Sequence, residues 1–375
     1  NRIKNCSSVM KNRTPYSFVF AGGGTGGHLY PALAVAQQIR LMKPESEILF
    51  VGAKHKIEER IVPEYGFNFK TIWISGFSRK LSLSNLLFPL KLFVSAIQSL
   101  MINFSFKPRV AVGSGAYVSG PVIWAASVLG SKVILLEQNS YPGVTNRMLE
   151  KKANEIHITF EESKKYFRDE TKLKLSGNPI RINLKLSDKS EAKKKFGLNE
   201  LKKVLLVIGG SGGARSINQT VADNLNQLVS NNIQVIWQTG QFYYEQYKIF
   251  SNESVKVFPF ISDMSAAYSA SDIVLARSGA TTIAEVSFLA LPVVFVPSTN
   301  VAANHQYMNA KALKVVNAAE LIEDKNLKDE FFPVVNEIIF NEVRHEVLKK
   351  NISAFAKPLA AKIIAESAIK FAGII

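Results

Sequence analysis

The chain has 375 residues, of which 47% are apolar, so it is long enough for two domains with separate cores and too apolar to be disordered. Its single cysteine, Cys6, excludes a disulfide framework and a cysteine zinc site and fits a reducing compartment. The formal charge of +16 fits a general basic bias, an anionic membrane surface or a phosphorylated substrate. Because no zinc-finger spacing or ribonucleoprotein signature accompanies that charge, we expect no nucleic-acid partner.

The first half of the chain alternates strand-like and helix-like segments. Residues 1–15 are polar and basic, and we expect them to form a flexible tail. A strand at 17–21 runs into the glycine-rich turn 22–27, which opens a helix. Further strands are expected at 47–51, 69–74, 109–112, 132–136, 155–158 and 173–175. Most of them are continuous apolar runs, which is typical of strands buried on both faces of a parallel sheet.

The longest apolar segment runs from Leu86 to Ile102. Polar residues and a proline interrupt it, so it falls short of the roughly 20 apolar residues of a membrane span. Its apolar side chains follow helical spacing from Leu90 to Met101, which predicts an amphipathic helix with that stripe in the core. The segment from Phe77 to Leu92 combines leucines with basic residues and predicts an interfacial patch for an anionic membrane. The alternative is a loose loop beside a core helix.

The second half repeats this scheme. A strand at 203–208 precedes the glycine-rich turn 209–214 and a helix, and further strands are expected at 234–238, 255–258, 273–276 and 293–296. A Gly-Asn-Pro turn at 177–179 predicts the domain boundary. The expected fold class is α/β, with two Rossmann-like doubly wound domains, 16–177 and 178–351, facing each other across a cleft. Residues 352–375 would form a helix that packs back on the first domain.

The two glycine-rich turns predict where a ligand binds. Each places backbone N–H groups at the positive end of a helix, which favours phosphate or sugar hydroxyls. The first turn matches Gly-x-Gly-x-x-Gly in spacing only, because the region where an acid is expected reads Arg40 to Pro44, with Glu45 and Glu47 only beyond it. This turn is not a Walker loop either, since no Gly-Lys-Ser/Thr follows. Ligands of open α/β sheets bind at the carboxyl ends of the strands, so we expect the site between the domains.

Several polar residues near strand ends are candidates for chemistry. His28 lies where the first turn meets its helix and could accept a proton near neutral pH, or be exposed there without a role. Glu137 and Asn139 follow a buried strand. Glu285 could bind a ribose diol, or simply favour the start of its helix. Gln306 could bind sugar hydroxyls, or lie in a surface turn. The five histidines lack ligand spacing, so we expect no metal and no cofactor.

A series of short motifs resembles the UDP-N-acetylglucosamine transferases of peptidoglycan synthesis, the MurG family. The motifs are Gly-Gly-Thr-Gly-Gly-His (23–28), Tyr-Val-Ser-Gly-Pro (117–121), Glu-Gln-Asn (137–139), Gly-Asn-Pro-Ile-Arg (177–181), Gly-Gly-Ser (209–211), Arg-Ser-Gly-Ala (277–280) and His-Gln (305–306). Their order is specific, although no single motif is. The chain departs from the family at Gly212, where many members have Gln, and at Leu136, where His is common.

The resemblance implies a glycosyltransferase B arrangement and an activity. The family transfers N-acetylglucosamine from UDP to the 4-hydroxyl of the muramoyl sugar of lipid I, with inversion, and forms lipid II. The implied partners are UDP-N-acetylglucosamine, lipid I and the anionic cytoplasmic surface of the bacterial inner membrane, where the protein would be peripheral. Another UDP-sugar transferase with a lipid acceptor, and a nucleotide-binding module without transfer, are the alternatives.

The resemblance also implies roles for individual residues. Thr25, Gly26 and Gly27 would meet the diphosphates of donor and acceptor, and Asn139 would contact the transferred sugar. Arg181 and Ser211 would contact the donor at the leaving diphosphate. The backbone of Ile261 would bind uracil, and Gln306 would bind the hydroxyls of N-acetylglucosamine. The sugar and ribose would be bound by Ala280, Thr281, Thr282, Ile283, Ala284 and Glu285, with Glu285 on the ribose hydroxyls. Inverting transfer needs a general base. His28 is our first candidate and Glu137 our second.

Overall fold

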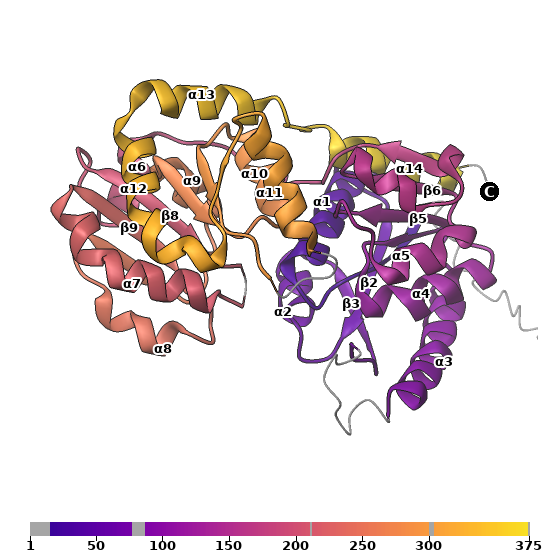
Figure 1. Ribbon diagram of the computed structural model, residues 1–375. Helices are drawn as coiled ribbons and strands as arrows, with labels where there is room; N and C mark the ends of the chain where they lie inside the picture. Colours follow the sequence, from indigo (N-terminus) through magenta and orange to yellow (C-terminus); the bar gives the residue numbers. More distant parts are fainter. Residues whose placement is uncertain (1–15, 77–86, 211, 300–303, 374–375) are drawn as a thin grey trace, which may run out of the picture.

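The computed structural model describes residues 16–76, 87–210, 212–299 and 304–373, which form two α/β domains (Figure 1). The strands of the first domain are β1 (Ser17–Ala21), β2 (Glu47–Ala53), β3 (Asn68–Ile72), β4 (Val110–Gly113), β5 (Lys132–Glu137), β6 (Glu155–Ile158) and β7 (Leu173–Leu175). They form a parallel sheet in the order β3-β2-β1-β4-β5-β6-β7. The winding direction changes between β1 and β4, and such a switch point leaves a crevice at the carboxyl ends of the strands.

Both faces of this sheet are apolar and both are covered by helices. Phe18 and Phe20 of β1 face one core, whereas Val19 and Ala21 face the other. The first face is covered by α1 (Gly26–Met42), α2 (Ile57–Glu64) and α14 (Ala360–Gly373). The second face is covered by α4 (Ala116–Val128) and α5 (Val144–Leu149). This explains why the strands read as continuous apolar runs.

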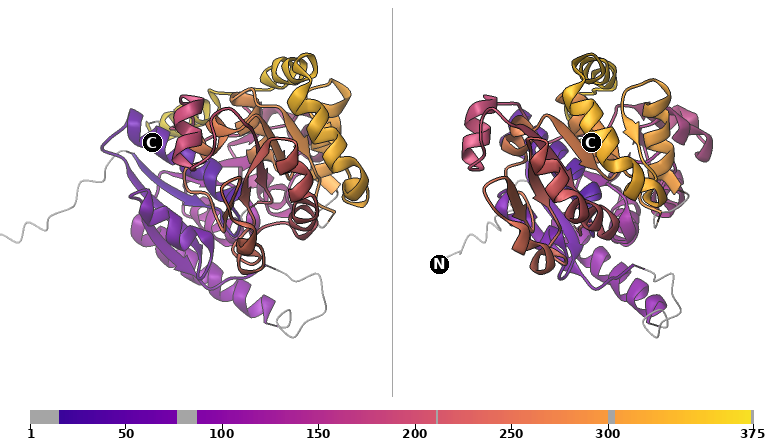
Figure 2. Two further views of the ribbon diagram at one scale, coloured as in Figure 1. Left: turned by 90° about the vertical axis from the view of Figure 1, so that its left-hand side faces the viewer. Right: turned by 60° about the vertical axis from the view of Figure 1, so that its left-hand side comes forward.

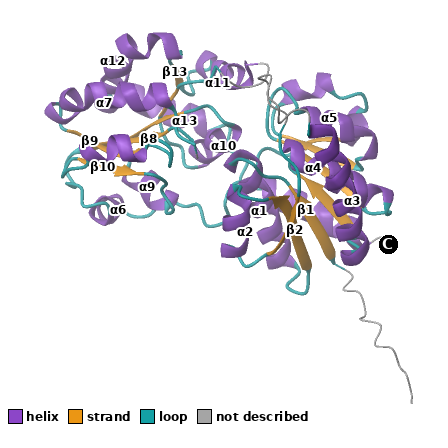
Figure 3. Ribbon diagram, turned by 90° about the horizontal axis from the view of Figure 1, so that it is seen from below, coloured by secondary structure: helices purple, strands orange, loops and turns teal. Residues whose placement is uncertain are grey.

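The second domain repeats the arrangement with its own sheet (Figure 3). Its strands are β8 (Lys203–Ile208), β9 (Ile233–Gln238), β10 (Val255–Phe258), β11 (Ile273–Ala276), β12 (Val293–Phe295) and β13 (Glu320–Leu321), in the parallel order β10-β9-β8-β11-β12-β13. One face packs on α6 (Lys189–Lys195), α9 (Met264–Ala270), α10 (Ala280–Phe288) and α11 (His305–Val315), and the other on α7 (Arg215–Ser230) and α12 (Leu327–Phe340). The expected fold class is therefore confirmed.

The chain crosses between the domains twice, after β7 and again between α13 (Glu342–Ser353) and α14 (Figure 1). The two crossings touch at Gly177, where a Cβ atom would lie 2.4 Å from the Cβ of Lys357. Gly177 also has φ of +85°, a conformation that favours glycine. After the second crossing, α14 buries Ile364 and Ala368 in the core of the first domain beside α1. The helix α14 thus belongs to the first domain although it ends the described chain.

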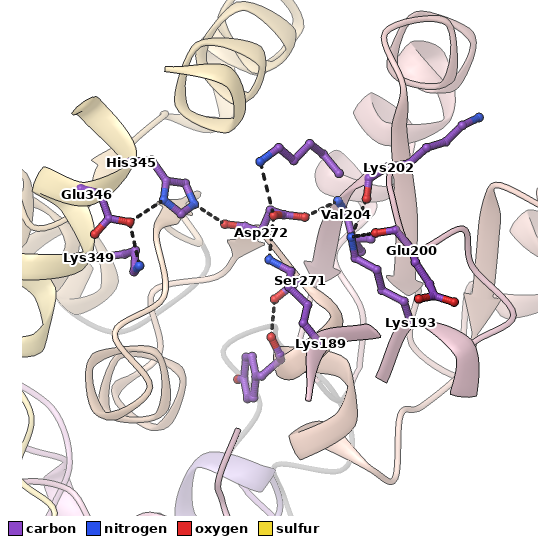
Figure 4. Close-up of polar contacts among 12 residues, drawn as sticks. Lys189, Lys193, Glu200, Lys202, Val204, Ser271, Asp272, His345, Glu346 and Lys349 are labelled. Carbon is purple, nitrogen blue, oxygen red and sulfur yellow. Dashed lines mark hydrogen bonds and ion pairs between the residues drawn. The ribbon is translucent and has the colours of Figure 1, made fainter. Parts of the chain in front are cut away.

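A buried carboxylate anchors the second domain at the edge away from the cleft. Asp272 precedes β11, and its carboxylate accepts hydrogen bonds from the backbone N–H of Val204 at 2.8 Å and from Lys189 Nζ at 2.7 Å (Figure 4). The carbonyl of Asp272 accepts from Nε2 of His345 at 3.0 Å. This residue therefore ties α6, β8 and α13 together at the amino ends of the strands, and α13 is held where the chain begins its second crossing.

The helix α3 (Phe88–Phe106) is oriented opposite to the expectation from its sequence. Ser95, Ser99 and Asn103 are buried, and Asn103 Nδ2 donates to the carbonyl of Val122 on α4 at 3.3 Å. The apolar stripe expected in the core is instead largely exposed, with Phe93 at 65% and Met101 at 66%. Small polar side chains allow α3 to lie close to α4, and the helix projects from the edge of the first domain (Figures 1 and 2).

The length and composition of α3 also bear on its relation to a bilayer. Within the described ranges, α3 is the one helix long and apolar enough to cross a membrane, and 17% of its apolar window is buried. Its exposed apolar face is continued toward the N-terminal end by Leu87, whereas residues 77–86 of the expected membrane patch lie outside the described residues.

Candidate active site

A cleft of about 990 Å³ lies between the two domains, at the carboxyl ends of their strands. Residues 25–28 line it from the turn after β1. Residues 208–210 and 213–214 line it from the turn after β8, and residues 279–282 from the start of α10. The structure therefore brings both glycine-rich turns to one cavity, as the sequence predicted. Ser211 lies outside the described residues.

His28 lies in the first turn of α1, and its hydrogen bonds select one tautomer of the imidazole. Its Nδ1 lies 2.8 Å from the carbonyl of Ser114, and the hydroxyl of Ser114 donates to the carbonyl of His28 at 2.7 Å. Because a carbonyl can only accept, Nδ1 carries the proton and Nε2 is left as the basic nitrogen. Burial lowers the pKa of His28, while the Ser114 carbonyl, the Gln138 side chain and Glu58 act to raise it and His305 acts to lower it. The imidazole is therefore suited to accept a proton.

Glu137, the second candidate base, is not at the cleft surface. Its side chain is 2% exposed, and it does not line the cavity. The carboxylate accepts from the backbone N–H groups of Asn139 and Gly143, both at 3.0 Å, and from Asn146 Nδ2 at 2.9 Å. Burial raises the pKa of Glu137, and these donors oppose that shift. Glu137 thus fixes the turn that presents Asn139 to the cleft, and its carboxylate is bonded within that turn and not placed at the cleft surface.

The candidate ribose ligand Glu285 takes part in a cluster that joins the domains. Its Oε1 lies 3.3 Å from Nε of Arg181, and its Oε2 accepts from the hydroxyl of Tyr268 at 2.8 Å. The guanidinium carbon of Arg181 lies 4.2 Å from the ring centroid of Tyr30, which belongs to α1 of the first domain. Burial and the neighbouring Glu285 hold the pKa of Tyr268 well above its usual value, so its hydroxyl remains a donor.

The helix α10 presents only part of the expected stretch to the cleft. Ala280, Thr281, Thr282 and Glu285 line it. Ile283 lies in the core of the second domain, and Ala284 packs against that core. The side chains of these last two residues are therefore not placed at the cleft. The reason is helical geometry, because successive residues point to different sides of the helix.

Two further expected contacts are oriented by their neighbours. The backbone N–H of Ile261 donates to Oε1 of Gln238 at 2.9 Å, and Nε2 of Gln238 donates to the carbonyl of Gly210 at 3.2 Å. The N–H group of Ile261 is therefore bonded to a side chain that also holds the second glycine-rich turn. The side-chain oxygen of Gln306 accepts from the backbone N–H of Ser298 at 2.9 Å, which fixes the direction of its amide.

The cleft also contains residues that sequence reasoning did not assign. Tyr30 and Gln138 line it, and Gln238 connects the second turn to Ile261. Gln138 belongs to a motif that was recognised, whereas nothing in the residue type of Tyr30 distinguishes it from a core aromatic. In the part of the chain that the structure describes, no group of three His, Cys, Asp or Glu residues could hold a metal ion.

Comparisons with known proteins agree with this geometry. The glycosyltransferase family 28 N-terminal domain matches residues 18–158, and the family 28 C-terminal domain matches residues 204–364. Two relatives are named UDP-N-acetylglucosamine–N-acetylmuramyl-(pentapeptide) pyrophosphoryl-undecaprenol N-acetylglucosamine transferase. The one from Flavobacterium psychrophilum is 44% identical to this chain, and the one from Cytophaga hutchinsonii is 43% identical. The alignments cover 95% of this chain and 97% and 96% of theirs.

Solved structures show the same fold. MurG of Acinetobacter baumannii superposes with a TM-score of 0.69 at 26% identity, covering 95% of this chain and 100% of that one. A UDP complex of MnaA from S. aureus shares the fold alone, with a TM-score of 0.66 at 13% identity over 93% of this chain and 94% of that one. By its two domains and its relatives, the chain belongs to glycosyltransferase family 28 and, within it, to the MurG family of N-acetylglucosaminyltransferases.

Proposed function

We propose that this chain transfers N-acetylglucosamine from UDP-N-acetylglucosamine to the 4-hydroxyl of the muramoyl sugar of lipid I, with inversion, and so forms lipid II. The observation that carries the proposal is the meeting of both glycine-rich turns, His28, Arg181 and Glu285 in one cleft of a MurG-family chain. The relatives at 43–44% identity are named for this transfer.

The second domain and Arg181 would hold the donor. The turn after β8 leads into α7, whose first turn carries no acid, so the positive end of its dipole can face a diphosphate. When the donor binds, the carboxylate of Glu285 would release Arg181 and accept hydrogen bonds from the ribose hydroxyls. The guanidinium of Arg181 would then contact the diphosphate. Asn139, Gln306 and the start of α10 would bind the sugar, and the Ile261 backbone would meet uracil.

The first domain would hold the acceptor and supply the base. In this mechanism Nε2 of His28 takes the proton from the 4-hydroxyl as that oxygen attacks the anomeric carbon. The bond from the anomeric carbon to the UDP oxygen breaks on the opposite side, so the configuration inverts. UDP leaves with the electron pair, and Arg181 and the N–H groups of the turn after β8 stabilise its charge.

The reaction is tested by incubating the protein with labelled UDP-N-acetylglucosamine and a lipid I analogue. We expect the disaccharide product, and we expect His28→Gln to lower kcat by about 10²–10⁴-fold, as loss of a general base does, with UDP affinity unchanged. His55→Gln, which alters an exposed histidine, is the control. A product with another sugar or lipid would favour the alternative transferase. A kcat within a few-fold of wild type for His28→Gln would exclude His28 as the base.

The pH dependence follows from the pKa of His28. Because burial lowers that pKa below 6.5, the neutral, proton-accepting imidazole persists as the pH falls through 6.5. We therefore expect the acidic limb of the kcat/KM profile to lie below pH 6.5, together with the NMR titration of the His28 ring. An acidic limb and a ring titration at or above pH 6.5 would contradict this account.

We also propose that the protein associates peripherally with an anionic membrane surface, at the cytoplasmic face of the inner membrane. The support is the exposed apolar face of α3, formed by Leu90, Phe93, Ile97, Met101 and Phe104. Lys91 and Lys107 lie near its two ends, where each cation near an anionic surface contributes about 1 kcal/mol. The candidate surface is therefore the helix itself, in addition to the segment before it.

Sedimentation with anionic lipid vesicles tests this surface. We expect Phe93→Ser combined with Phe104→Ser to weaken binding roughly tenfold or more, because each buried aromatic side chain contributes about 1.5–3 kcal/mol. The control is Leu201→Ser, which removes an apolar side chain that is 95% exposed on the second domain. Equal binding by the double variant and the wild type would remove α3 from the account.

A further inference from the structure

A carboxylate beneath the first glycine-rich turn is not explained by the mechanism above. Glu58 lies in the first turn of α2 and is 1% exposed, and it does not line the cleft. Its Oε2 accepts from the backbone N–H of Gly24 at 2.8 Å, and its Oε1 accepts from that of Ala53 at 3.1 Å. We propose that Glu58 is a positioning residue that holds the turn 22–25 in the shape that presents residues 25–28 to the acceptor substrate.

The two contacts join the carboxyl ends of neighbouring strands. Gly24 follows β1, and Ala53 is the last residue of β2, which pairs with β1 in parallel. One side chain therefore fixes the start of the turn against a rigid sheet edge. Since Gly24 has φ of +77°, the turn adopts a backbone conformation that few other residues would take, and an external tie at this residue determines its direction.

The space around Glu58 is created by glycines. A Cβ atom at Gly23 would lie 2.3 Å from the carboxyl carbon of Glu58, and a Cβ atom at Gly52 would lie 2.5 Å from its Cγ. The Glu58 carboxylate is thus a sufficient reason for glycine at position 23, because any larger residue would overlap it. Contact with a ligand in the cleft is not needed to explain this glycine. This separates the turn into a part that fits Glu58 and a part, residues 25–28, that faces the cleft.

The alternative is a purely structural role. A carboxylate in the first turn of α2 is favoured by the helix dipole, and a glutamine would retain most of its volume. However, a glutamine offers one accepting oxygen, so its amide nitrogen would face one of the two N–H donors. Glu58→Gln therefore breaks the link between the turn at Gly24 and the end of β2 at Ala53, while the side-chain volume is kept.

The proposal rests on the proposed function, because it assigns the turn to the acceptor. For Glu58→Gln we expect the KM for a lipid I analogue to rise about tenfold or more, while the Kd for UDP, measured by calorimetry, stays within twofold. The matched control is Glu59→Gln, the next residue of α2, whose more exposed carboxylate contacts the backbone N–H of His55. We expect it to match the wild type in both quantities.

Hydrogen exchange gives a readout that does not depend on transfer. We expect peptides covering residues 22–28 to exchange faster in Glu58→Gln, and peptides covering 212–218 to be unchanged. If Glu58→Gln does not fold, Gly23→Ala displaces the carboxylate from the other side and should give the same pattern. Unchanged exchange at 22–28, or equal losses of UDP and acceptor affinity, would overturn the proposal. Failure of the wild type to use lipid I would instead count against the proposed function.

Discussion

The site depends on two helix N-termini that face one cleft. The helices α1 and α7 each follow a glycine-rich turn at the carboxyl end of a parallel strand, and neither has an acid in its first turn. Two positive dipole ends and the guanidinium of Arg181 make this cavity favourable for an anion. The sheets must therefore keep their carboxyl edges toward each other, and the two crossings that meet at Gly177 and Lys357 help to fix that relation.

Three buried carboxylates organise the walls of this cavity. Glu58 holds the turn before α1, Glu137 holds the turn that carries Asn139, and Glu285 pairs with Arg181 and Tyr268. Two of them accept hydrogen bonds from backbone N–H groups away from the cleft, so they shape the site without contacting a ligand. Of the three, only Glu285 lines the cavity. For this reason Glu285 is the one of the three to which we assign the ribose in the proposed function.

The sequence predicts most of the fold, because its signals are local. Both sheets, both glycine-rich turns and their meeting in one cleft follow from apolar runs, glycine positions and the switch-point rule. The sequence could not show toward which neighbour a given side chain points. Helical spacing identified the apolar stripe of α3 but not that Ser95, Ser99 and Asn103 face α4. In the same way, Glu137 stands at a strand end as expected, but its carboxylate does not line the cleft. The contact of Glu58 with the glycine-rich turn gives no local signal, because it joins residues 34 positions apart.

The proposed reaction requires a sugar diphosphate to bind between the two glycine-rich turns. A crystal structure of the protein with UDP-N-acetylglucosamine tests it most directly. We expect the diphosphate within hydrogen-bond distance of the backbone between 209 and 215 and of Arg181, with the ribose on Glu285 and the sugar directed toward the start of α1. A nucleotide bound outside this cleft, for example in the smaller cavity lined by Tyr65, Asn183 and Ser265, would contradict it.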